Sequence, residues 1–240
     1  MKIYIGATLQ SIPEWITVET ISGGEKLNTE ELNDRPGEAF VSSVLKAKTL
    51  SCSGVVIASS ISAVETEMSR IMNILRGKEL KVYRDNESAV YYPCRLSGDI
   101  KAGFYNGRTI GKAFTVQFTL KSLYPWGFGA SVSQTMTAGN NTVANAGNIE
   151  VVPTITFVGP KTLTGTIVTC GGKAVALNDT VLVPSGQSLV FSESSLVLNG
   201  TDITNMLTDS SILVPLVLQS GSNTVSVNEV STIAFSPRYV

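Results

Sequence analysis

The chain has 240 residues, of which 43% are hydrophobic and 15% are charged, and its formal net charge at pH 7 is −1. This composition indicates a folded protein with one large or two ordinary domains rather than a disordered chain. The near-neutral charge also argues against nucleic-acid binding through a general basic surface.

The first half of the chain predicts several β-strands. Residues 112–125 show the clearest pattern, because Phe114, Val116 and Phe118 alternate with polar residues as in a half-buried strand. The pair Asn106–Gly107 suits a tight hairpin turn before this strand. Enrichment in β-branched and aromatic residues predicts the other strands of this half at residues 2–7, 39–59, 80–84 and 89–100.

One helix is predicted at about residues 62–76. Ser62 and Glu65 form a capping box at its start, and Gly77 can take the left-handed conformation that ends a helix. Apolar residues at helical spacing predict one stripe that packs on a sheet, formed by Val64, Met68, Ile71 and Leu75.

Residues 22–38 form a polar, glycine-punctuated segment between two predicted strands. A loop of this length without secondary structure is uncommon in a compact domain, and it usually serves a function or is disordered. Two interpretations stay open: a mobile loop, or an arm that becomes ordered against a neighbouring subunit. The candidate interface residues of such an arm are Glu25, Lys26, Glu30, Glu31, Asp34 and Arg35.

A change of composition near residue 128 predicts two domains. Residues 1–128 carry 15 Lys and Arg and 13 Asp and Glu, whereas residues 129–240 carry 3 and 6. The second part shows short strand patterns separated by turn signals, and no helical period, which is typical of an antiparallel β-sandwich. We expect an N-terminal β-domain at residues 1–130, a linker at 131–148 and a β-sandwich at 149–240.

The sequence offers little for catalysis. It contains no histidine, and its three cysteines are far apart and are expected to be buried free thiols. Neither a metal nor a cofactor is expected, and no nucleotide-binding glycine motif occurs. A carboxylate pair, as in glycoside hydrolysis, is the remaining option, although we expect the carboxylates to be solvated surface groups. These carboxylates are Glu30, Glu31, Glu150, Asp179, Glu193, Asp202, Asp209 and Glu229.

Neither membrane insertion nor secretion is predicted. No apolar run reaches the ~18 residues of a membrane span. The apolar run before Gln10 is too short for the core of a signal peptide. We expect no membrane partner, and synthesis in the cytoplasm.

A binding role for the sandwich is an alternative function. β-Sandwich modules bind sugars by stacking them on exposed aromatic rings, with polar groups alongside. After residue 129 the aromatic residues are Phe157, Phe191, Phe235 and Tyr239, and the first three lie in strand patterns that predict burial. A carbohydrate- or cell-wall-binding adhesin therefore stays as the second hypothesis.

Residues 145–160 resemble a joint between domains. Gly147 permits a turn, Asn145 and Asn148 can cap it through their side chains, and Pro153 suits an edge or first-strand position. Glu150 is the only charged residue of the stretch. We interpret Asn145, Gly147, Asn148 and Pro153 as a hinge rather than a ligand site.

The same stretch carries a family resemblance. Asn145, Gly147, Pro153 and Ile155 resemble the N-x-G-x-x-x-x-x-P-x-I pattern that begins the C-terminal domain of distal tail proteins of long-tailed bacteriophages. The segment 220–227 resembles a late G-x-N hairpin of that family, and residues 35–129 follow the element order of its N-terminal domain. The resemblance covers nearly the whole chain.

This resemblance implies a mainly β fold with two β-sandwich-type domains, the first with a single packed helix and the second galectin-like. It implies a structural virion protein without enzymatic activity, made in the cytoplasm of the host bacterium. Such proteins form a hexameric ring that joins the tail tube to the receptor-binding proteins of the tail tip. DNA passes through the ring without specific binding, and a long N-terminal loop, here residues 22–38, reaches the next subunit.

Overall fold

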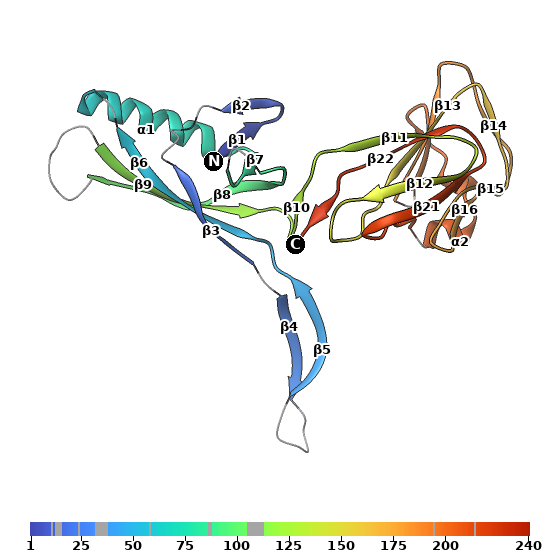
Figure 1. The fold of residues 1–240 in the computed structure, drawn as a ribbon, viewed down its shortest axis with the longest axis horizontal. Helices are drawn as coiled ribbons and strands as arrows, with labels where there is room; N and C mark the ends of the chain where they lie inside the picture. The colour runs from blue at the N-terminus through green and yellow to red at the C-terminus, as the bar shows by residue number, and fades with distance from the viewer. Residues whose placement is uncertain are drawn as a thin grey trace. The chain divides into compact units, whose positions relative to one another are not determined.

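The computed structural model divides the chain into two compact units, residues 1–127 and 128–240 (Figure 1). It describes residues 1–10, 12, 16–23, 25–31, 38–57, 59–85, 88–104, 113–193, 195–213 and 215–240. The expected turn at Asn106–Gly107, and Asp34 and Arg35 of the expected arm, lie outside the described residues. The prediction of a mainly β fold with a packed helix in the first unit is confirmed.

The first unit is an antiparallel sheet with a helix along one face (Figure 1). Its strand order is β2-β1-β7-β8-β9-β6-β3. Leu50, Val116 and Leu120 point to the helix side and are completely buried, whereas Gln117 on the opposite face is exposed. The elements are β1 (Lys2–Ile5), β2 (Thr8–Gln10), β3 (Thr17–Ser22), β4 (Glu25–Glu31), β5 (Glu38–Leu45), β6 (Thr49–Ile57), α1 (Ile61–Leu75), β7 (Leu80–Tyr83), β8 (Tyr91–Phe104) and β9 (Ala113–Ser122), with β10 (Gly127–Phe128) at the unit boundary.

The helix α1 begins at Ile61, one residue earlier than the sequence predicts. Ser60 is the N-cap, and its side chain accepts a hydrogen bond from the Ala63 backbone N–H at 3.2 Å. The expected cap, Ser62, lies inside the helix, because Ser60 already takes the extended conformation that a capping residue needs. Gly77 has φ of +67°, as its expected left-handed role requires. The predicted stripe is buried, and Ile74 joins it.

A separate β-hairpin replaces the expected loop at residues 22–38. Glu25–Glu31 and Glu38–Leu45 form the antiparallel pair β4 and β5, which pairs with no other described strand (Figure 1). The predicted strand at 39–59 is therefore two strands, β5 and β6. The sequence did not reveal β4 because its residues, EKLNTEE, are mostly polar, as in a loop.

The second unit is a β-sandwich. A six-stranded sheet has the order β11-β22-β13-β18-β19-β20, a four-stranded sheet has the order β12-β21-β15-β16, and β14 pairs with β17. Side chains of both sheets form one core, which contains Phe157, Phe191 and Val225. The elements are β11 (Val132–Met136), β12 (Gly139–Asn145), β13 (Thr154–Val158), β14 (Lys161–Leu163), β15 (Thr166–Cys170), β16 (Lys173–Ala176), β17 (Val181–Val183), β18 (Ser188–Ser192), β19 (Ser195–Leu198), β20 (Thr201–Asp202), a 3-10 turn (Thr204–Met206), α2 (Asp209–Leu213), β21 (Gly221–Val227), β22 (Ser231–Phe235) and β23 (Arg238–Tyr239).

The expected linker at residues 131–148 belongs to this sandwich. β11 pairs with β22, and β12 pairs with β21 over seven residues from Gly139 to Asn145. Met136 and Val143 are completely buried in the core. The linker interpretation is therefore wrong: the segment forms two strands of the sandwich. Its composition resembles that of a loop because the outward faces of these strands are polar. The helical turns at 204–206 and 209–213 were also not expected.

Candidate functional site

Asn145 organises the segment between β12 and β13. Its side chain is 1% exposed, and its Oδ1 accepts a hydrogen bond from the Gly147 N–H at 3.0 Å. Its Nδ2 donates to the carbonyl oxygens of Ile149 at 2.9 Å and of Leu218 at 3.4 Å. The side chain therefore satisfies buried backbone groups that would otherwise lack partners.

Gly147 and Asn148 bind the C-terminal segment of the sandwich. The Asn148 N–H donates to the Arg238 carbonyl at 3.0 Å, and Asn148 Oδ1 accepts from the Val240 N–H at 2.9 Å. A side chain at Gly147 would come within 2.6 Å of the Arg238 nitrogen. Only glycine fits such a close approach of two backbones.

The hinge interpretation of this stretch is therefore corrected. Asn145, Gly147 and Asn148 lie inside the second unit, and Pro153 is buried just before β13. The prediction that Asn145 caps a turn through its side chain is confirmed, whereas the Asn148 side chain accepts from the distant Val240 N–H instead. What it could not show is that the turn lies against Leu218 and Arg238, which are distant in the chain.

Two further asparagines hold turns in the same way, and the sequence reasoning missed one of them. Asn141 accepts from the Thr137 N–H at 2.9 Å, and Asn223 accepts from the Gln219 N–H at 2.9 Å. In both turns a glycine with positive φ precedes the asparagine by two residues. The repeated G-x-N spacing at 139–141 and 221–223 is the signal that could have identified the pair.

Of the predicted arm residues, the structure places Glu25, Lys26, Glu30 and Glu31. All four lie in β4, with Glu25 paired to Leu45 and Glu31 paired to Glu38 across the hairpin. The hairpin leaves the sheet between β3 and β6, where Ser22 pairs with Thr49. Whether it contacts a neighbouring subunit stays a prediction.

Several carboxylates considered for catalysis have local structural partners. Glu150 accepts a hydrogen bond from Gln219 Nε2 at 3.1 Å, and Glu229 lies 3.5 Å from Lys161 Nζ. The Asp202 side chain accepts from the Thr204 N–H at 2.8 Å, and hydrogen bonding from the Thr204 side chain, together with this backbone bond, lowers the pKa of the Asp202 carboxyl. These groups hold turns and loops of the second unit.

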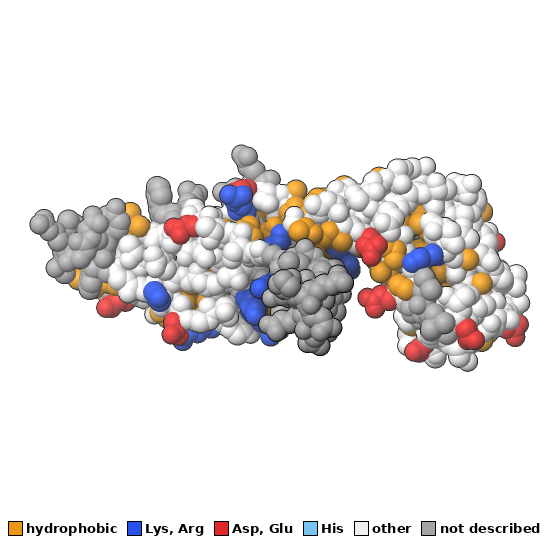
Figure 2. All heavy atoms as spheres, turned by 90° about the horizontal axis from the view of Figure 1, so that it is seen from below, with side chains coloured by type: hydrophobic (Ala, Val, Ile, Leu, Met, Phe, Trp, Pro, Cys, Tyr) orange, Lys and Arg blue, Asp and Glu red, His pale blue; other side chains and the backbone are white. Residues whose placement is uncertain are grey.

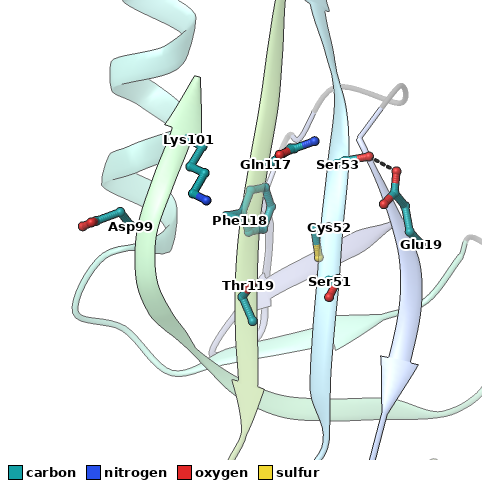
Figure 3. Close-up of a pocket in the computed structure, with 9 residues that line it drawn as sticks. All are labelled: Glu19, Ser51, Cys52, Ser53, Asp99, Lys101, Gln117, Phe118 and Thr119. Carbon is teal, nitrogen blue, oxygen red and sulfur yellow. Dashed lines mark hydrogen bonds between the residues drawn. The ribbon is translucent and has the colours of Figure 1, made fainter. Parts of the chain in front are cut away.

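A polar depression of about 270 Å³ lies on the sheet face opposite α1 in the first unit (Figure 3). Ser53 donates a hydrogen bond to the Glu19 carboxylate at its rim, while Asp99 points away from the depression. Cys52 is one of the residues that line the depression, but its side chain lies in the core on the other side of the sheet, where burial raises the pKa of the thiol to about 12. A neutral thiol is a poor nucleophile, so this arrangement does not form an activated site.

The described residues offer neither a metal cluster nor a membrane-spanning helix. Within the described ranges, no group of three or more His, Cys, Asp or Glu residues is placed to hold a metal ion. No helix in the part of the chain that the structure describes is long and apolar enough to cross a membrane.

The three phenylalanines of the sandwich are buried. Phe157 and Phe191 are completely buried, and Phe235 is 6% exposed. Their predicted burial is confirmed. Since sugars stack on exposed rings, these three phenylalanines cannot serve the adhesin alternative.

Partly exposed aromatic rings occur on the first unit. Tyr83 lies between Tyr4 and Tyr91, with 5.6 Å between ring centroids in each pair. The Lys81 Nζ lies 5.3 Å from the centroid of the Tyr91 ring, within the range of a cation–π interaction. Partial burial raises the pKa of Tyr83 and Tyr91.

These rings share a sheet face with several basic residues. Lys2 is the cross-strand partner of Tyr83, and Arg95 lies on the same side of β8 as Tyr91 and opposite Lys121 of β9. Each is at least partly exposed. We call this surface the tyrosine face, which consists of Lys2, Tyr4, Lys81, Tyr83, Tyr91, Arg95 and Lys121. The sequence could not predict it, because residue 4 meets residue 83 only through long-range strand pairing.

The charge of the two units differs on the surface as it does in the sequence. Figure 2 shows several Lys and Arg side chains on the unit that carries the helix, and mostly uncharged side chains on the sandwich. The first unit therefore offers more charged contacts to a partner than the second.

Comparison with solved structures identifies a known fold. The Dit protein (gp 19.1) of phage SPP1, described as a paradigm of hub adsorption apparatus in phages that infect Gram-positive bacteria, superimposes with a TM-score of 0.77. The two sequences are 16% identical, and the match covers 100% of this chain and 99% of that one. The chain thus has the fold of a phage distal tail protein, as the sequence resemblance implied.

Two further solved structures match this chain less closely. The baseplate of phage P2 in its activated conformation, solved with Ca and with Sr, matches with a TM-score of 0.47 and 10% identity. These matches cover 98% and 100% of this chain, and 97% and 98% of the phage P2 chains. No family model and no curated protein matches the sequence.

Proposed function

We propose that this chain is a structural protein of a bacteriophage tail and forms the ring-shaped hub at its distal end. The observation that carries the proposal is the end-to-end fold match with the SPP1 Dit protein, at a TM-score of 0.77. A match that covers both units favours the same architecture throughout, rather than one shared module in an unrelated protein.

In the proposed ring, six copies of the chain associate through their first units. It joins the tail tube protein to the tail-tip and receptor-binding proteins, and the hairpin β4–β5 reaches the neighbouring copy. The second unit faces outward and docks partner proteins. The protein is made in the bacterial cytoplasm and functions in the virion.

Two properties of the chain support a passive channel without enzymatic activity. The formal net charge of −1 disfavours strong attraction to DNA, so DNA could slide through the lumen without specific binding. The buried Cys52 thiol, with its pKa near 12, and the locally bonded carboxylates of the second unit suit a structural rather than a catalytic role.

Light scattering and negative-stain electron microscopy of the purified chain test this proposal. Rings of uniform size at micromolar to millimolar concentration, alone or with tail tube protein, are expected. A chain that remains strictly monomeric under both conditions would contradict the hub function.

A further inference from the structure

Two basic side chains stand opposite each other on the tyrosine face. Arg95 of β8 and Lys121 of β9 are direct cross-strand partners, and both side chains are exposed. The Cβ atoms of such partners lie about 5 Å apart, and like charges in this arrangement destabilise a sheet. Within the described ranges, neither residue takes part in an ion pair. An anion bound between the two side chains would remove this repulsion.

The same face continues as an alternation of cations and aromatic rings. Lys2 of β1 is paired with Tyr83 of β7. Two residues along the same strands, Tyr4 is paired with Lys81, so the order of ring and cation is reversed. Tyr83 is also paired with Tyr91 of β8. From β9 to β1 the face spans three strand intervals, or about 14 Å. A single small anion can reach only one end of this face, whereas a chain with several anionic groups can follow it.

The residue types favour phosphate groups that are joined by hydroxylated carbon units. The guanidinium of Arg95 can bind a phosphate through two parallel hydrogen bonds, and lysine binds phosphate as a point charge. Burial raises the pKa of Tyr83 and Tyr91, so their hydroxyls stay protonated and can donate to phosphate or hydroxyl oxygens. The rings also offer apolar surface to the C–H groups of a polyol. The alternation therefore matches a polymer in which phosphates alternate with polyol units.

Two other polyanions fit this face less well. The bases of a single-stranded nucleic acid stack on ring faces. The planes of Tyr4 and Tyr83 lie at 64° and those of Tyr83 and Tyr91 at 44°, so neighbouring rings do not present parallel faces to successive bases. An acidic protein surface is also less suitable, because lysine supplies three of the four basic residues of the face and is depleted at protein interfaces.

We propose that the tyrosine face binds a linear polymer in which phosphate groups alternate with polyol units. Arg95 and Lys121 hold one phosphate, the lysines of β1 and β7 hold others, and the tyrosine rings contact the carbon units between them. The four basic residues outweigh the neighbouring Glu79, so the face attracts a polyanion although the whole chain has a net charge of −1. This binding site goes beyond the proposed ring and does not depend on it.

Fluorescence anisotropy of the full chain with a labelled oligo(glycerol phosphate) tests this site. We expect saturable binding that weakens as the salt concentration rises from about 50 to about 200 mM, because counterion release then contributes less. Arg95→Gln/Lys121→Gln should weaken binding by about tenfold or more, since two charged hydrogen-bond donors are lost. This variant should melt at or above the wild-type temperature, because the repulsion between the two side chains is removed. Its loss of binding is then not caused by unfolding.

A ring variant separates the phosphate contacts from the polyol contacts. Tyr83→Ala should weaken binding of oligo(glycerol phosphate) by about threefold or more, because an aromatic contact is lost. Binding of inorganic polyphosphate, which has no carbon units, should change less. An equal loss with both probes would contradict the contact between the rings and the polyol.

Lys101→Gln/Lys173→Gln is the control variant, because it removes the same charge at exposed positions outside the tyrosine face. It should bind the oligomer as the wild type does. Absence of binding to the wild type, or an equal loss in the control, overturns the inference. Tighter binding of poly-glutamate or of oligo-dT also overturns it and assigns the face to an acidic protein or to a single-stranded nucleic acid. Ring formation is measured separately by light scattering, so a failure of this site leaves the proposed function standing.

Discussion

The backbone N–H of Gly147 donates a hydrogen bond to Oδ1 of Asn145 at 3.0 Å, inside the sandwich. The two residues were expected at a hinge between domains. They instead fix a turn whose other side is the backbone of Arg238, near the last residue of the chain. The second unit is therefore closed by contacts between a turn near its beginning and its end.

Asn145→Ala should destabilise the second unit. The substitution leaves the Gly147 N–H and the Ile149 carbonyl without their side-chain partner in a buried turn. Each unsatisfied buried group costs about 1–3 kcal/mol, so we expect the free energy of unfolding to fall by at least about 2 kcal/mol. Urea denaturation followed by circular dichroism measures this change.

Asn140→Ala is the matched control, because Asn140 lies on the same strand with an exposed side chain. Its effect should stay within about 0.5 kcal/mol, as is usual for surface substitutions. Equal effects of the two variants would show that the Asn145 hydrogen bonds do not stabilise the sandwich.

Ser60→Ala should destabilise α1, whereas Ser62→Ala should not. Ser60 accepts the hydrogen bond from the Ala63 N–H, and loss of an N-cap costs about 1 kcal/mol. Ser62 is exposed inside the first turn, where alanine has the better helix propensity. Thermal unfolding of the two variants measures these effects. A larger fall in melting temperature for Ser62→Ala than for Ser60→Ala would show that Ser62 caps the helix, as the sequence predicts.

The strongest sequence patterns gave the elements correctly, and the failures have local causes. The alternation at Phe114–Leu120 and the stripe from Val64 to Leu75 predicted β9 and α1, because each has one buried face. Residues 131–148 and 22–38 were predicted as a linker and a loop because their strands carry polar residues and glycine, as loops do. The asparagine turns and the tyrosine face depend on partners far away in the chain, so no local pattern specifies them.

The stability of the first unit should fall as the pH rises above 9. Burial raises the pKa of the Cys52 and Cys94 thiols from 9.0 to about 12. The folded state keeps both thiols neutral, whereas the unfolded state ionises them first. The stabilisation is complete below pH 9 and is lost as the pH approaches 12, by about 1.4 kcal/mol per pH unit and thiol.

Urea denaturation between pH 8 and pH 10.5 measures this slope. The variant Cys52→Ala/Cys94→Ala should show a shallower slope, although its stability at pH 8 is also lower because of the cavities. At pH 8 both native thiols should react with a thiol reagent only after urea is added. Rapid labelling of Cys52 or Cys94 in the folded protein would show that the thiols are not protected.

Replacement of residues 24–45 by Gly-Ser should abolish assembly and leave each subunit folded. Ser22 and Thr49 are already cross-strand partners, so a short connection can join β3 to β6 without moving either strand. The replacement keeps Lys48, whose carbonyl accepts the Ser122 N–H at 2.8 Å. Because β4 and β5 pair with no other described strand, the melting temperature should change by less than about 3 °C. Light scattering should then show monomers at concentrations where the full chain forms rings. Rings that persist without the hairpin would mean that other surfaces of the first unit hold the copies together.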